Sequence, residues 1–481
     1  MLCVLPTVAQ AAIRKGDRVV VRRTHTKLDG KKGKVVRVLK RRRRAVVRFD
    51  SRRVHPRRRV VRLRNLRRLP KRHARAPVRA VPAPIVTAPG SSPAPAPPPE
   101  PEPPPTRFVA PNGSDSNRGC NQPTAPCRTF DAAYRAATAG EVVGVAGGDY
   151  PGQTIVHDGA KTSGPNITFR PLAGAVVSVT GNLNIWASYV TVRQMRIVDV
   201  TVRPEDLPVN PPAVTSVRLE NVDGRNFEIF SATNVSVIGG DYGPASACGG
   251  DFGGSNNSIR KVTPTDPANI LIDGVTIHDI QTYDLVACHL EGLAIFAGKN
   301  VTVRNSKFFG NSVYDIFFQA NSGPVSGVTL ENNWFAAPVD THGARQGNAL
   351  GFSSVDSGVT IRNNSFDSAI SLDDDGNDPQ FTSFVVSGNI GELLSDCGSL
   401  RGIVFSYNVW RDTVCGGTNA SFSGTYPYAR DALDATLDFH LTGGPAVDRI
   451  PPQFAGVTRD IDGDARPQGA GVDAGSDEIR R

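Results

Sequence analysis

The chain has 481 residues, too many for one ordinary hydrophobic core, so its length predicts two or three domains. Residues 14–79 hold 29 of the 55 Lys and Arg and 3 of the 45 Asp and Glu, a net charge of +26, and the other residues hold 26 basic and 42 acidic side chains, a net of −16. So basic a run indicates either a polyanionic partner or a solvated arm. No apolar stretch reaches the ~18 residues of a membrane span, which excludes a spanning helix.

The first twelve residues indicate export. Leu2–Ala12 is a short apolar stretch broken by Pro6, and Ala9-Gln10-Ala11 has the small-x-small form of a signal-peptide cleavage site. The basic start of a signal peptide is missing, so we expect the true start codon upstream of Met1. The prediction is a secreted or cell-envelope protein, and the alternative is a cytosolic protein with an apolar N-terminus.

The number of cysteines also favours export, to an oxidising compartment in which disulfides form. Beyond Cys3, which would leave with the signal peptide, six cysteines remain, and an even number suits disulfides. The sequence does not fix their connectivity, and no CxxC spacing favours a metal site instead. The simplest pairing joins neighbours along the chain: Cys120 with Cys127, Cys248 with Cys288, and Cys397 with Cys415.

Residues 13–75 alternate apolar and basic side chains, which predicts four or five short strands joined by turns. Residues 13–39 (IRKGDRVVVRRTHTKLDGKKGKVVRVL), with Gly33 opening a strand, resemble the KOW motif of small SH3-like barrels. The resemblance implies a small barrel that binds RNA or protein. For an exported chain, an anionic cell-wall polymer or extracellular nucleic acid is the expected partner.

Residues 76–106 are rich in proline and cannot build a core, so they are predicted to form an extended, semi-rigid linker.

A strand followed by Asn or Gly recurs beyond the linker. The strands begin at Val190, Val235, Ile270, Val301, Val328, Val359 and Phe384. The last five begin 31, 27, 31 and 25 residues apart, a spacing typical of solenoids and shorter than that of propeller blades. Because no single coil can bury its own apolar face, the coils must stack on one another.

Asn or Gly ends each strand, where the chain must bend through left-handed dihedral angles. Three coils end alike: Arg304-Asn305-Ser306-Lys307-Phe308, Glu331-Asn332-Asn333-Trp334-Phe335 and Arg362-Asn363-Asn364-Ser365-Phe366. We expect the asparagines to form a hydrogen-bonded ladder and the phenylalanines to stack inside.

These repeats resemble those of secreted bacterial β-helix proteins of the pectate-lyase type. Residues 108–155, with a short helix expected over Asp131–Ala139 and an N-cap at Thr129 or Asp131, resemble their N-terminal capping segment. Residues 441–481 resemble their C-terminal segment, through Gly443-Gly444-Pro445-Ala446-Val447-Asp448 and Asp460–Arg466. The resemblance implies an all-β, right-handed parallel β-helix over residues 107–440. A monomer is expected.

Residues one coil apart lie ~4.8 Å apart, so alignment of the coils predicts which side chains meet. Glu291 and Asp315 are 24 residues apart, about one coil, with His289 two residues before Glu291. We expect the two carboxylates to stack and to raise one pKa, as an acid/base pair or a cation site. The alternative is that both are turn residues that bond backbone amides and that His289 is an outward-facing surface residue.

Basic residues on adjacent loops are candidates for binding the carboxylate of a uronate, as in polysaccharide lyases. They are Lys299, Arg304, Lys307, His342 and Arg345.

Two oxygen-rich segments are candidate calcium loops, with Asp373 and Asp375 in one and Asp460, Asp462 and Asp464 in the other. Neither completes an EF-hand, and plain Asx-turns are the alternative. Apart from Ca²⁺ no cofactor is expected.

The sequence therefore leaves three functions open. The first is a secreted protein that binds a polysaccharide and cleaves it as a lyase or a glycosidase. The second is a non-catalytic adhesin or glycan-binding scaffold, anchored through the basic module. The third is a nucleic-acid-binding protein that acts through residues 13–75 alone.

Overall fold

The computed structural model describes residues 103–480 and, at the level of the backbone, five strands between residues 18 and 68. Within 103–480 the gaps are residue 118, 207–210, 246–256, 282–289, 337–347, residue 356, 373–381, 394–401, 412–415, 424–425 and 430–437. The chain divides into two compact units, 1–87 and 88–481, and the division falls inside the predicted linker.

The strands of the first unit form one antiparallel sheet in the order β4-β3-β2-β1-β5. Their bounds are β1 (Arg18–Val21), β2 (Lys32–Leu39), β3 (Arg44–Phe49), β4 (Arg58–Arg62) and β5 (Leu66–Arg68). Five strands agree with the alternating sequence pattern. The closed barrel and the KOW resemblance stay predictions.

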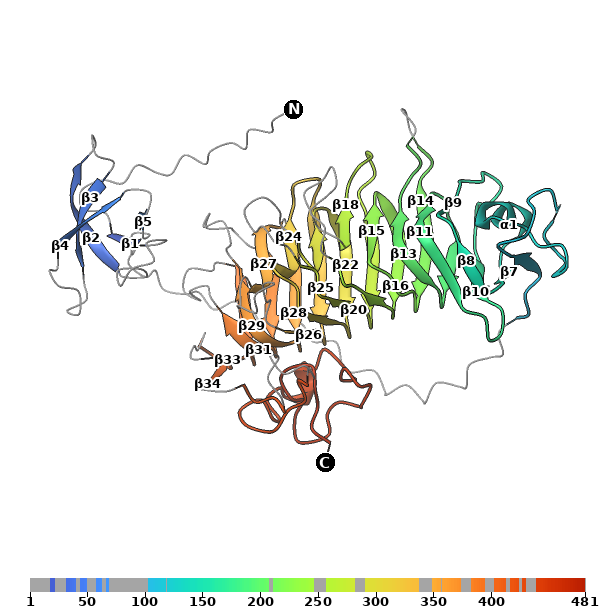
Figure 1. The fold of residues 1–481 in the computed structure, drawn as a ribbon. Helices are drawn as coiled ribbons and strands as arrows, with labels where there is room; N and C mark the ends of the chain where they lie inside the picture. The colour runs from blue at the N-terminus through green and yellow to red at the C-terminus, as the bar shows by residue number, and fades with distance from the viewer. Residues whose placement is uncertain are drawn as a thin grey trace. The chain divides into compact units, whose positions relative to one another are not determined.

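The second unit is a right-handed parallel β-helix, the predicted fold, in which each coil crosses three stacked sheets (Figure 1). The first stack, the long sheet, has twelve parallel strands. They are β6 (Arg107–Val109), β7 (Val142–Val145), β10 (Ile167–Pro171), β12 (Val190–Arg193), β14 (Val214–Glu220), β16 (Ala232–Ile238), β19 (Ala268–Asp273), β22 (Gly298–Arg304), β25 (Val325–Glu331), β28 (Ser357–Arg362), β30 (Phe384–Ser387) and β32 (Ile403–Ser406).

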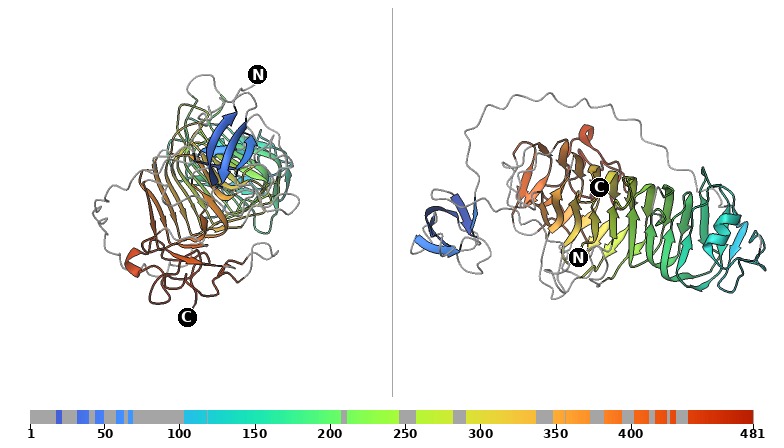
Figure 2. Two further views of the ribbon diagram at one scale, coloured as in Figure 1. Left: turned by 90° about the vertical axis from the view of Figure 1, so that its left-hand side faces the viewer. Right: turned by 90° about the horizontal axis from the view of Figure 1, so that it is seen from above.

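The other two stacks are the short sheet and the third sheet, which follow the long sheet in this order in each coil. The view along the solenoid shows the coils one behind another (Figure 2). The short sheet holds β8 (Gly148–Tyr150), β17 (Asp241–Tyr242), β20 (Thr276–His278), β23 (Lys307–Phe309), β26 (Trp334–Phe335), β33 (Val409–Arg411) and β34 (Ala420–Phe422). The third sheet holds β9 (Gln153–Ile155), β15 (Asn226–Phe230), β18 (Asn257–Arg260), β21 (Leu293–Ile295), β24 (Tyr314–Gln319) and β27 (Asn348–Ser354). Four strands run through both: β11 (Val177–Ile185), β13 (Arg196–Val202), β29 (Ser365–Ser371) and β31 (Ile390–Leu393).

The sequence repeat predicts the register of the long sheet correctly. The first apolar residue of each repeat pairs with its counterpart one coil on, as in Val235 with Ile270, Ile270 with Val301 and Val301 with Val328. The bend after each strand is left-handed, as expected, at Asn221, Gly239, Gly274, Asn305, Asn332, Asn363, Gly388 and Tyr407. Period-two alternation then sends every second side chain inward.

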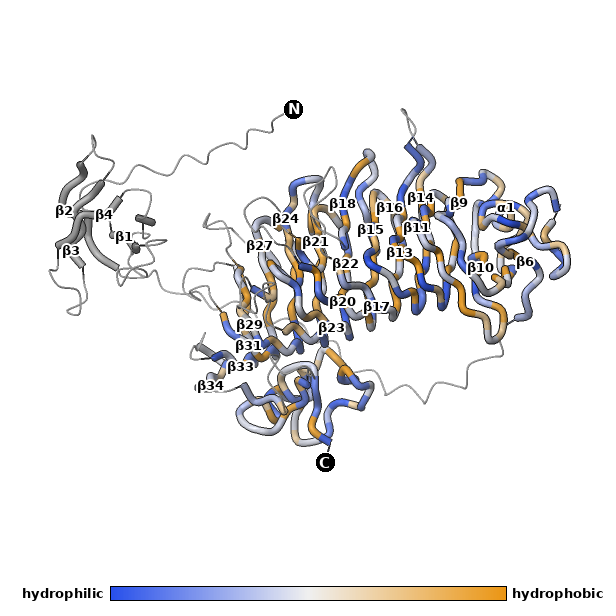
Figure 3. The backbone as a smooth tube through the Cα atoms, viewed as in Figure 1, coloured by the Kyte–Doolittle hydropathy of each residue, from blue (hydrophilic) through white to orange (hydrophobic). Residues whose placement is uncertain are grey.

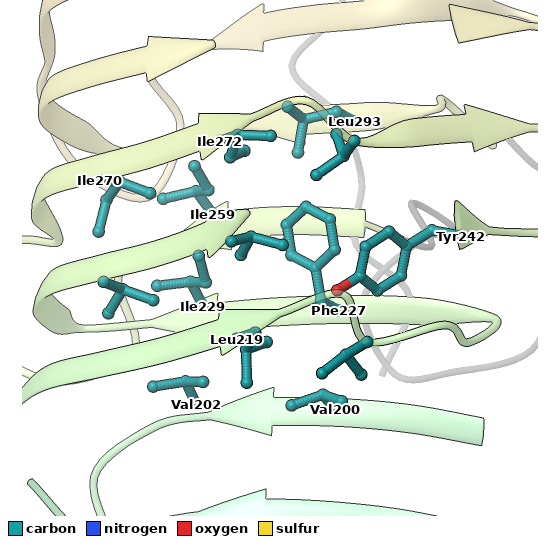
Figure 4. Packing of buried hydrophobic residues seen from close by; sticks show 14 of the residues in the cluster. Val200, Val202, Leu219, Phe227, Ile229, Tyr242, Ile259, Ile270, Ile272 and Leu293 are labelled. Atoms are coloured by element: carbon teal, nitrogen blue, oxygen red, sulfur yellow. The ribbon is translucent and has the colours of Figure 1, made fainter. Parts of the chain in front are cut away.

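The core is a column of aliphatic and aromatic side chains between the three sheets. Hydrophobic residues recur from strand to strand along the solenoid (Figure 3). Close up, Val200, Ile229 and Ile259 of the third sheet face Leu219 and Ile270 of the long sheet (Figure 4). Under the short sheet the phenylalanines stack as predicted, Phe308 on Phe335 at 5.0 Å and Phe335 on Phe366 at 4.8 Å between ring centroids.

Asparagines form the expected ladder, in two columns. In the outer column Asn332 Nδ2 donates to Asn305 Oδ1 over 2.7 Å. In the inner column the backbone N–H and Nδ2 of each asparagine both donate to the side-chain oxygen of the next. The inner column comprises Asn333, Asn364, Asn389, Asn408 and Asn419, all buried. It satisfies buried polar groups at a bend where no sheet can do so.

A short helix covers the N-terminal end of the solenoid. This helix, α1 (Phe130–Ala136), is shorter than expected, and its N-cap is Thr129, whose side chain accepts from the N–H of Ala132. Its Phe130 stacks on Phe169 of the core at 5.2 Å. Beside it the Cys120–Cys127 disulfide is present, as the simplest pairing predicts. The other five cysteines, Cys3 among them, lie outside the described residues.

Residues 438–480 form a C-terminal segment with one 3₁₀ turn, η3 (Pro452–Phe454), that packs on the C-terminal half of the short sheet (Figure 1). Trp334 of β26 packs on Phe439 of this segment, which stacks on Tyr428 at 4.7 Å. No helix among the described residues is long and apolar enough to cross a membrane.

Candidate functional site on the short sheet

The outer surface of the long sheet is occupied by ion pairs between successive coils. Arg304 Nε lies 2.9 Å from Asp273, and Arg362 Nε lies 2.8 Å from Glu331. These charges satisfy one another along the sheet, so this face is a structural ladder and offers few unpaired groups to a ligand.

The outer surface of the third sheet is covered over β18, β21 and β24. Its outward column there consists of Ser258, Ala294 and Phe317, and all three are buried. The guanidinium of Arg260 lies between the rings of Phe230 and Phe296, 5.3 and 5.0 Å from their centroids. A polymer cannot lie directly on these strands.

The short sheet has an outward column of mostly polar side chains, which is exposed at Arg196, Asp223 and Asp241 and buried at Trp334. In register along it stand Ser178, Arg196, Asp223, Asp241, Thr276, Lys307 and Trp334. Their neighbours in the strands, such as Ile197, Tyr242 and Ile277, lie in the core. Alternation therefore turns this column outward.

An open groove of about 380 Å³ crosses the first rungs of this column. Arg196, Asp223, Arg225 and Asp241 line it, together with apolar or small residues such as Val198. Gly224 allows two rungs to approach closely here, since a Cβ there would lie 2.2 Å from the carbonyl oxygen of Ile197. The groove thus has a polar rim over an apolar floor.

The rim is held by hydrogen bonds between rungs. Arg225 Nε donates to Asp199 over 2.8 Å, and Asp223 accepts from the backbone N–H of Asp241 over 3.2 Å. The imidazole of His278, one rung beyond, has Nε2 3.0 Å from Asp241 and Nδ1 2.8 Å from Asp279.

An aromatic ring packs against the imidazole of His278. Phe309 stacks on His278 with centroids 5.0 Å apart and planes 15° from parallel. The C-terminal segment begins to cover the short sheet at this point, because Phe309 is also in contact with the cluster around Trp334.

The arrangement suits a chain of hydroxylated rings. Guanidinium groups and carboxylates on successive rungs, ~4.8 Å apart, can hydrogen-bond successive ring substituents, while the apolar floor packs against C–H groups. Asp223 and Asp241 stand on neighbouring rungs, whose backbones are ~4.8 Å apart, so their carboxylates can reach the ~5–5.5 Å separation of retaining glycosidases.

The predicted pairing of Glu291 with Asp315 is wrong by one residue. Leu293 pairs with Ile316, which sets Gly292, and not Glu291, opposite Asp315. The N–H of Gly292 donates to the carbonyl oxygen of Tyr314 over 2.8 Å. A shift of one residue sends two side chains to opposite faces of a sheet. A catalytic role for the two residues stays a prediction, without the geometry that prompted it.

Both residues are buried, and Asp315 has no exposed surface. Its Oδ1 accepts from Asn311 Nδ2 over 2.7 Å, while Oδ2 has no hydrogen bond from any residue that the structure describes. Burial holds the pKa of Asp315 well above its ordinary value, although the bond from Asn311 acts the other way.

Of the basic residues predicted to bind a uronate, the three that the structure describes do not converge. Lys299 pairs with Asp266 over 2.7 Å and Arg304 joins the ion-pair ladder, both on the long sheet. Lys307 lies on the short sheet, but its Nζ is 4.1 Å from the centroid of Trp334. Their substrate-binding role is untested, and the groove offers other residues for it.

The second candidate calcium loop does not gather its carboxylates. Asp460 Oδ1 accepts the backbone N–H groups of Asp462 and Asp464, which is the Asx-turn alternative. Asp462 turns to His440 and Asp464 to Arg480. For Asp460, Asp462 and Asp464 to bind a single ion, the side chains of Asp462 and Asp464 would have to rotate toward Asp460.

Several predicted residues fall outside the described part of the chain. They are His289, His342, Arg345, Asp373, Asp375, Cys248, Cys288, Cys397 and Cys415.

Sequence reasoning missed the groove residues, although a signal for two of them was present. Asp223 stands two residues after the bend at Asn221, and Asp241 stands two residues after the bend at Gly239. Since the bends share one register, the second residue after each bend forms the outward column. Counting from the bends would have aligned Asp223 with Asp241.

No protein family matches the sequence, and no curated protein matches it. Solved structures with a similar course of the backbone include the pectate lyase Pel9A, at 14% identity over 78% of this chain and 96% of that one, with a TM-score of 0.41. A rhamnogalacturonan lyase (13% identity, 63% and 87% coverage, TM-score 0.34) and a mutant of the PL6-family alginate lyase AlyGC (14%, 66% and 55%, 0.33) are also similar. At these identities the likeness concerns the fold.

Proposed function

We propose that the chain is an extracellular protein that binds a polysaccharide along the short sheet, over the groove between Arg196 and His278. The observation that carries the proposal is the groove itself, a row of exposed hydrogen-bonding side chains repeated at the coil spacing above an apolar floor. A repeating surface matches a repeating ligand, because one contact recurs at each rung.

The first test is binding. Immobilised neutral and acidic polysaccharides are offered to the full chain and to Arg196→Ala, with Arg218→Ala as the matched control. Arg218 stands one coil further along the chain and on the long sheet, where it pairs with Glu220. Loss of one charged hydrogen bond predicts about tenfold weaker binding for Arg196→Ala and no change for the control. Equal affinity of both variants for every ligand would remove the groove from consideration.

Cleavage is a separate question, for which Asp223 and Asp241 are the candidate acid and base. A panel assayed for new reducing ends and for ultraviolet-absorbing unsaturated ends, with and without a chelator, separates hydrolase, lyase and inert scaffold. For a hydrolase that uses this pair, Asp223→Asn and Asp241→Asn each abolish new reducing ends but leave binding within a few-fold of wild type. Turnover that survives both substitutions excludes the pair.

The partition of charge favours a second activity. Residues 14–79 carry a net charge of +26, which suits attachment to an anionic cell-wall polymer or to nucleic acid. The basic module would then anchor the solenoid, and the solenoid would hold its own glycan.

A further inference from the structure

The C-terminal segment places His440 among three carboxylates. Its Nδ1 is hydrogen-bonded to Asp438, and its Nε2 lies 2.6 Å from Asp462 Oδ2. His440, Asp462 and Asp477 each offer one ligand atom, and these atoms lie within 4.8 Å of one another. The three residues come from three separate turns of the segment.

The imidazole cannot satisfy both carboxylates in its neutral form. A neutral imidazole has one N–H and one acceptor nitrogen, and an ionised carboxylate only accepts. With the N–H on Nδ1 donating to Asp438, the lone pair of Nε2 faces another acceptor, Asp462. A positive charge must accompany them. At the 2.6 Å of this contact it is a second proton, and a metal ion would be bound with the two ligand atoms turned further apart.

Asp477 points to the metal ion. It is 5% exposed, and its Oδ2 accepts from the backbone N–H of Leu441 over 2.7 Å. Its other oxygen receives no hydrogen bond from a residue that the structure describes. A carboxylate oxygen without a donor, on a buried side chain beside an imidazole nitrogen and a second carboxylate, is what a cation would satisfy.

The bond from His440 to Asp438 fits the same conclusion. A metal-bound histidine almost always donates its other ring N–H to a carboxylate or a carbonyl group, which fixes the tautomer and the ring plane. Trp334 of the short sheet stands edge-on to the imidazole, with centroids 5.3 Å apart and an angle of 87°, and limits its rotation further.

We propose that His440, Asp462 and Asp477 bind one divalent transition-metal ion of the Zn²⁺ type, which fastens the C-terminal segment beside Trp334. One imidazole nitrogen and two carboxylate oxygens suit Zn²⁺, whereas Ca²⁺ takes six to eight oxygens. Water would complete the coordination, because His440 and Asp462 are partly open to solvent. The site is independent of the groove and differs from the calcium loop expected over Asp460, Asp462 and Asp464.

The test uses the untagged full chain, stripped with a chelator and dialysed against Zn²⁺ or Ca²⁺. Metal content is measured by mass spectrometry, affinity by calorimetry and stability by thermal unfolding. Zn²⁺ is expected to bind and to raise Tm, and Ca²⁺ is not. His440→Gln and Asp462→Asn are expected to weaken Zn²⁺ binding at least ~10-fold and to lose the rise in Tm. Asp462 is chosen over Asp477 because it is exposed, so the variant should fold.

Asp464→Asn is the matched control, since Asp464 lies two residues from Asp462 but pairs with Arg480. It should bind Zn²⁺ as wild type does. The proposal is overturned if the stripped chain takes up no Zn²⁺, if Asp462→Asn binds as well as Asp464→Asn, or if Ca²⁺ gives the same rise in Tm. The first result would leave His440 as a doubly protonated ion-pair partner.

Discussion

A single carboxyl group shows how burial changes the role of a residue. The sequence predicts that Asp315 stacks on Glu291 as an acid/base pair or a cation site, and the structure buries it fully with one hydrogen bond, from Asn311. The sequence could not reveal this, because the register of the third sheet follows from loops of unequal length and not from a repeated motif. The effect of Asp315 on stability therefore follows from its raised pKa.

Stability should depend on pH through Asp315. Because burial raises its pKa in the folded chain, the folded state binds this proton more tightly than the unfolded state. The stabilisation is complete below the ordinary carboxyl pKa and is lost as pH rises through the folded pKa. Asp315→Asn, which is neutral at every pH and keeps an oxygen for Asn311, should raise Tm at pH 8 and change it little at pH 4.

Thermal unfolding of both proteins from pH 4 to pH 8 measures this effect. Asp149→Asn is a suitable control, since Asp149 is exposed in β8 and should shift Tm little at either pH. A larger loss of Tm for Asp315→Asn at pH 8 than at pH 4 would mean that the ionised carboxylate has a cationic partner.

Among the elements, the inner asparagine ladder fixes the bend between the long and short sheets. Asn364 accepts the backbone N–H and the side-chain N–H of Asn333, and its own Nδ2 donates to the carbonyl oxygen of Leu330 over 3.0 Å. All of these groups are buried, so each needs its partner.

Asn364→Ala should strongly destabilise the solenoid. It leaves the Asn333 N–H groups and the Leu330 carbonyl without partners, at about 1–3 kcal/mol each, so we expect a loss of about 3 kcal/mol or more in the free energy of unfolding. Asn300→Gly is the control: Asn300 is exposed, and glycine tolerates its left-handed φ of 55°, so the cost should stay under about 1 kcal/mol. Urea unfolding compares the two, and equal midpoints would contradict the ladder's importance.

The elements were the most predictable part of the molecule. Strand, bend, asparagine and phenylalanine recur at one position per coil, so aligning a few coils yields the register of the long sheet. The short sheet was harder, because β17 has two residues and the rung at Asp223 forms only an isolated bridge. Such rungs are too short to show alternation by themselves, so the groove residues can be aligned only by counting from the bends before them.

The whole chain joins two units of opposite charge. The basic unit carries the net charge of +26 and the acidic remainder −16, while the overall +10 conceals the division. The division of charge can be counted directly from the sequence. The partner of the basic unit cannot be named in this way, because many polyanions would suit a run of Lys and Arg.

The basic module should give the full chain a salt-sensitive affinity for polyanions. We expect retention on a sulfated polysaccharide or on duplex DNA that falls steeply with salt, because each neutralised phosphate or sulfate releases a counterion. The chain 88–481 should lose this retention and keep the groove's glycan binding. Column elution and fluorescence titration at several salt concentrations measure both; equal retention of the shortened chain would place the anion site elsewhere.

The register of the long sheet has a consequence for how such a molecule can change. Val235 stands one rung from Val217, 18 residues earlier, and one rung from Ile270, 35 residues later. The stack therefore accepts additional residues between rungs without losing alignment. Insertions or deletions in the loops between rungs can change the surroundings of the groove while the strands keep their spacing. A change of ligand preference therefore need not disturb the folding of the solenoid.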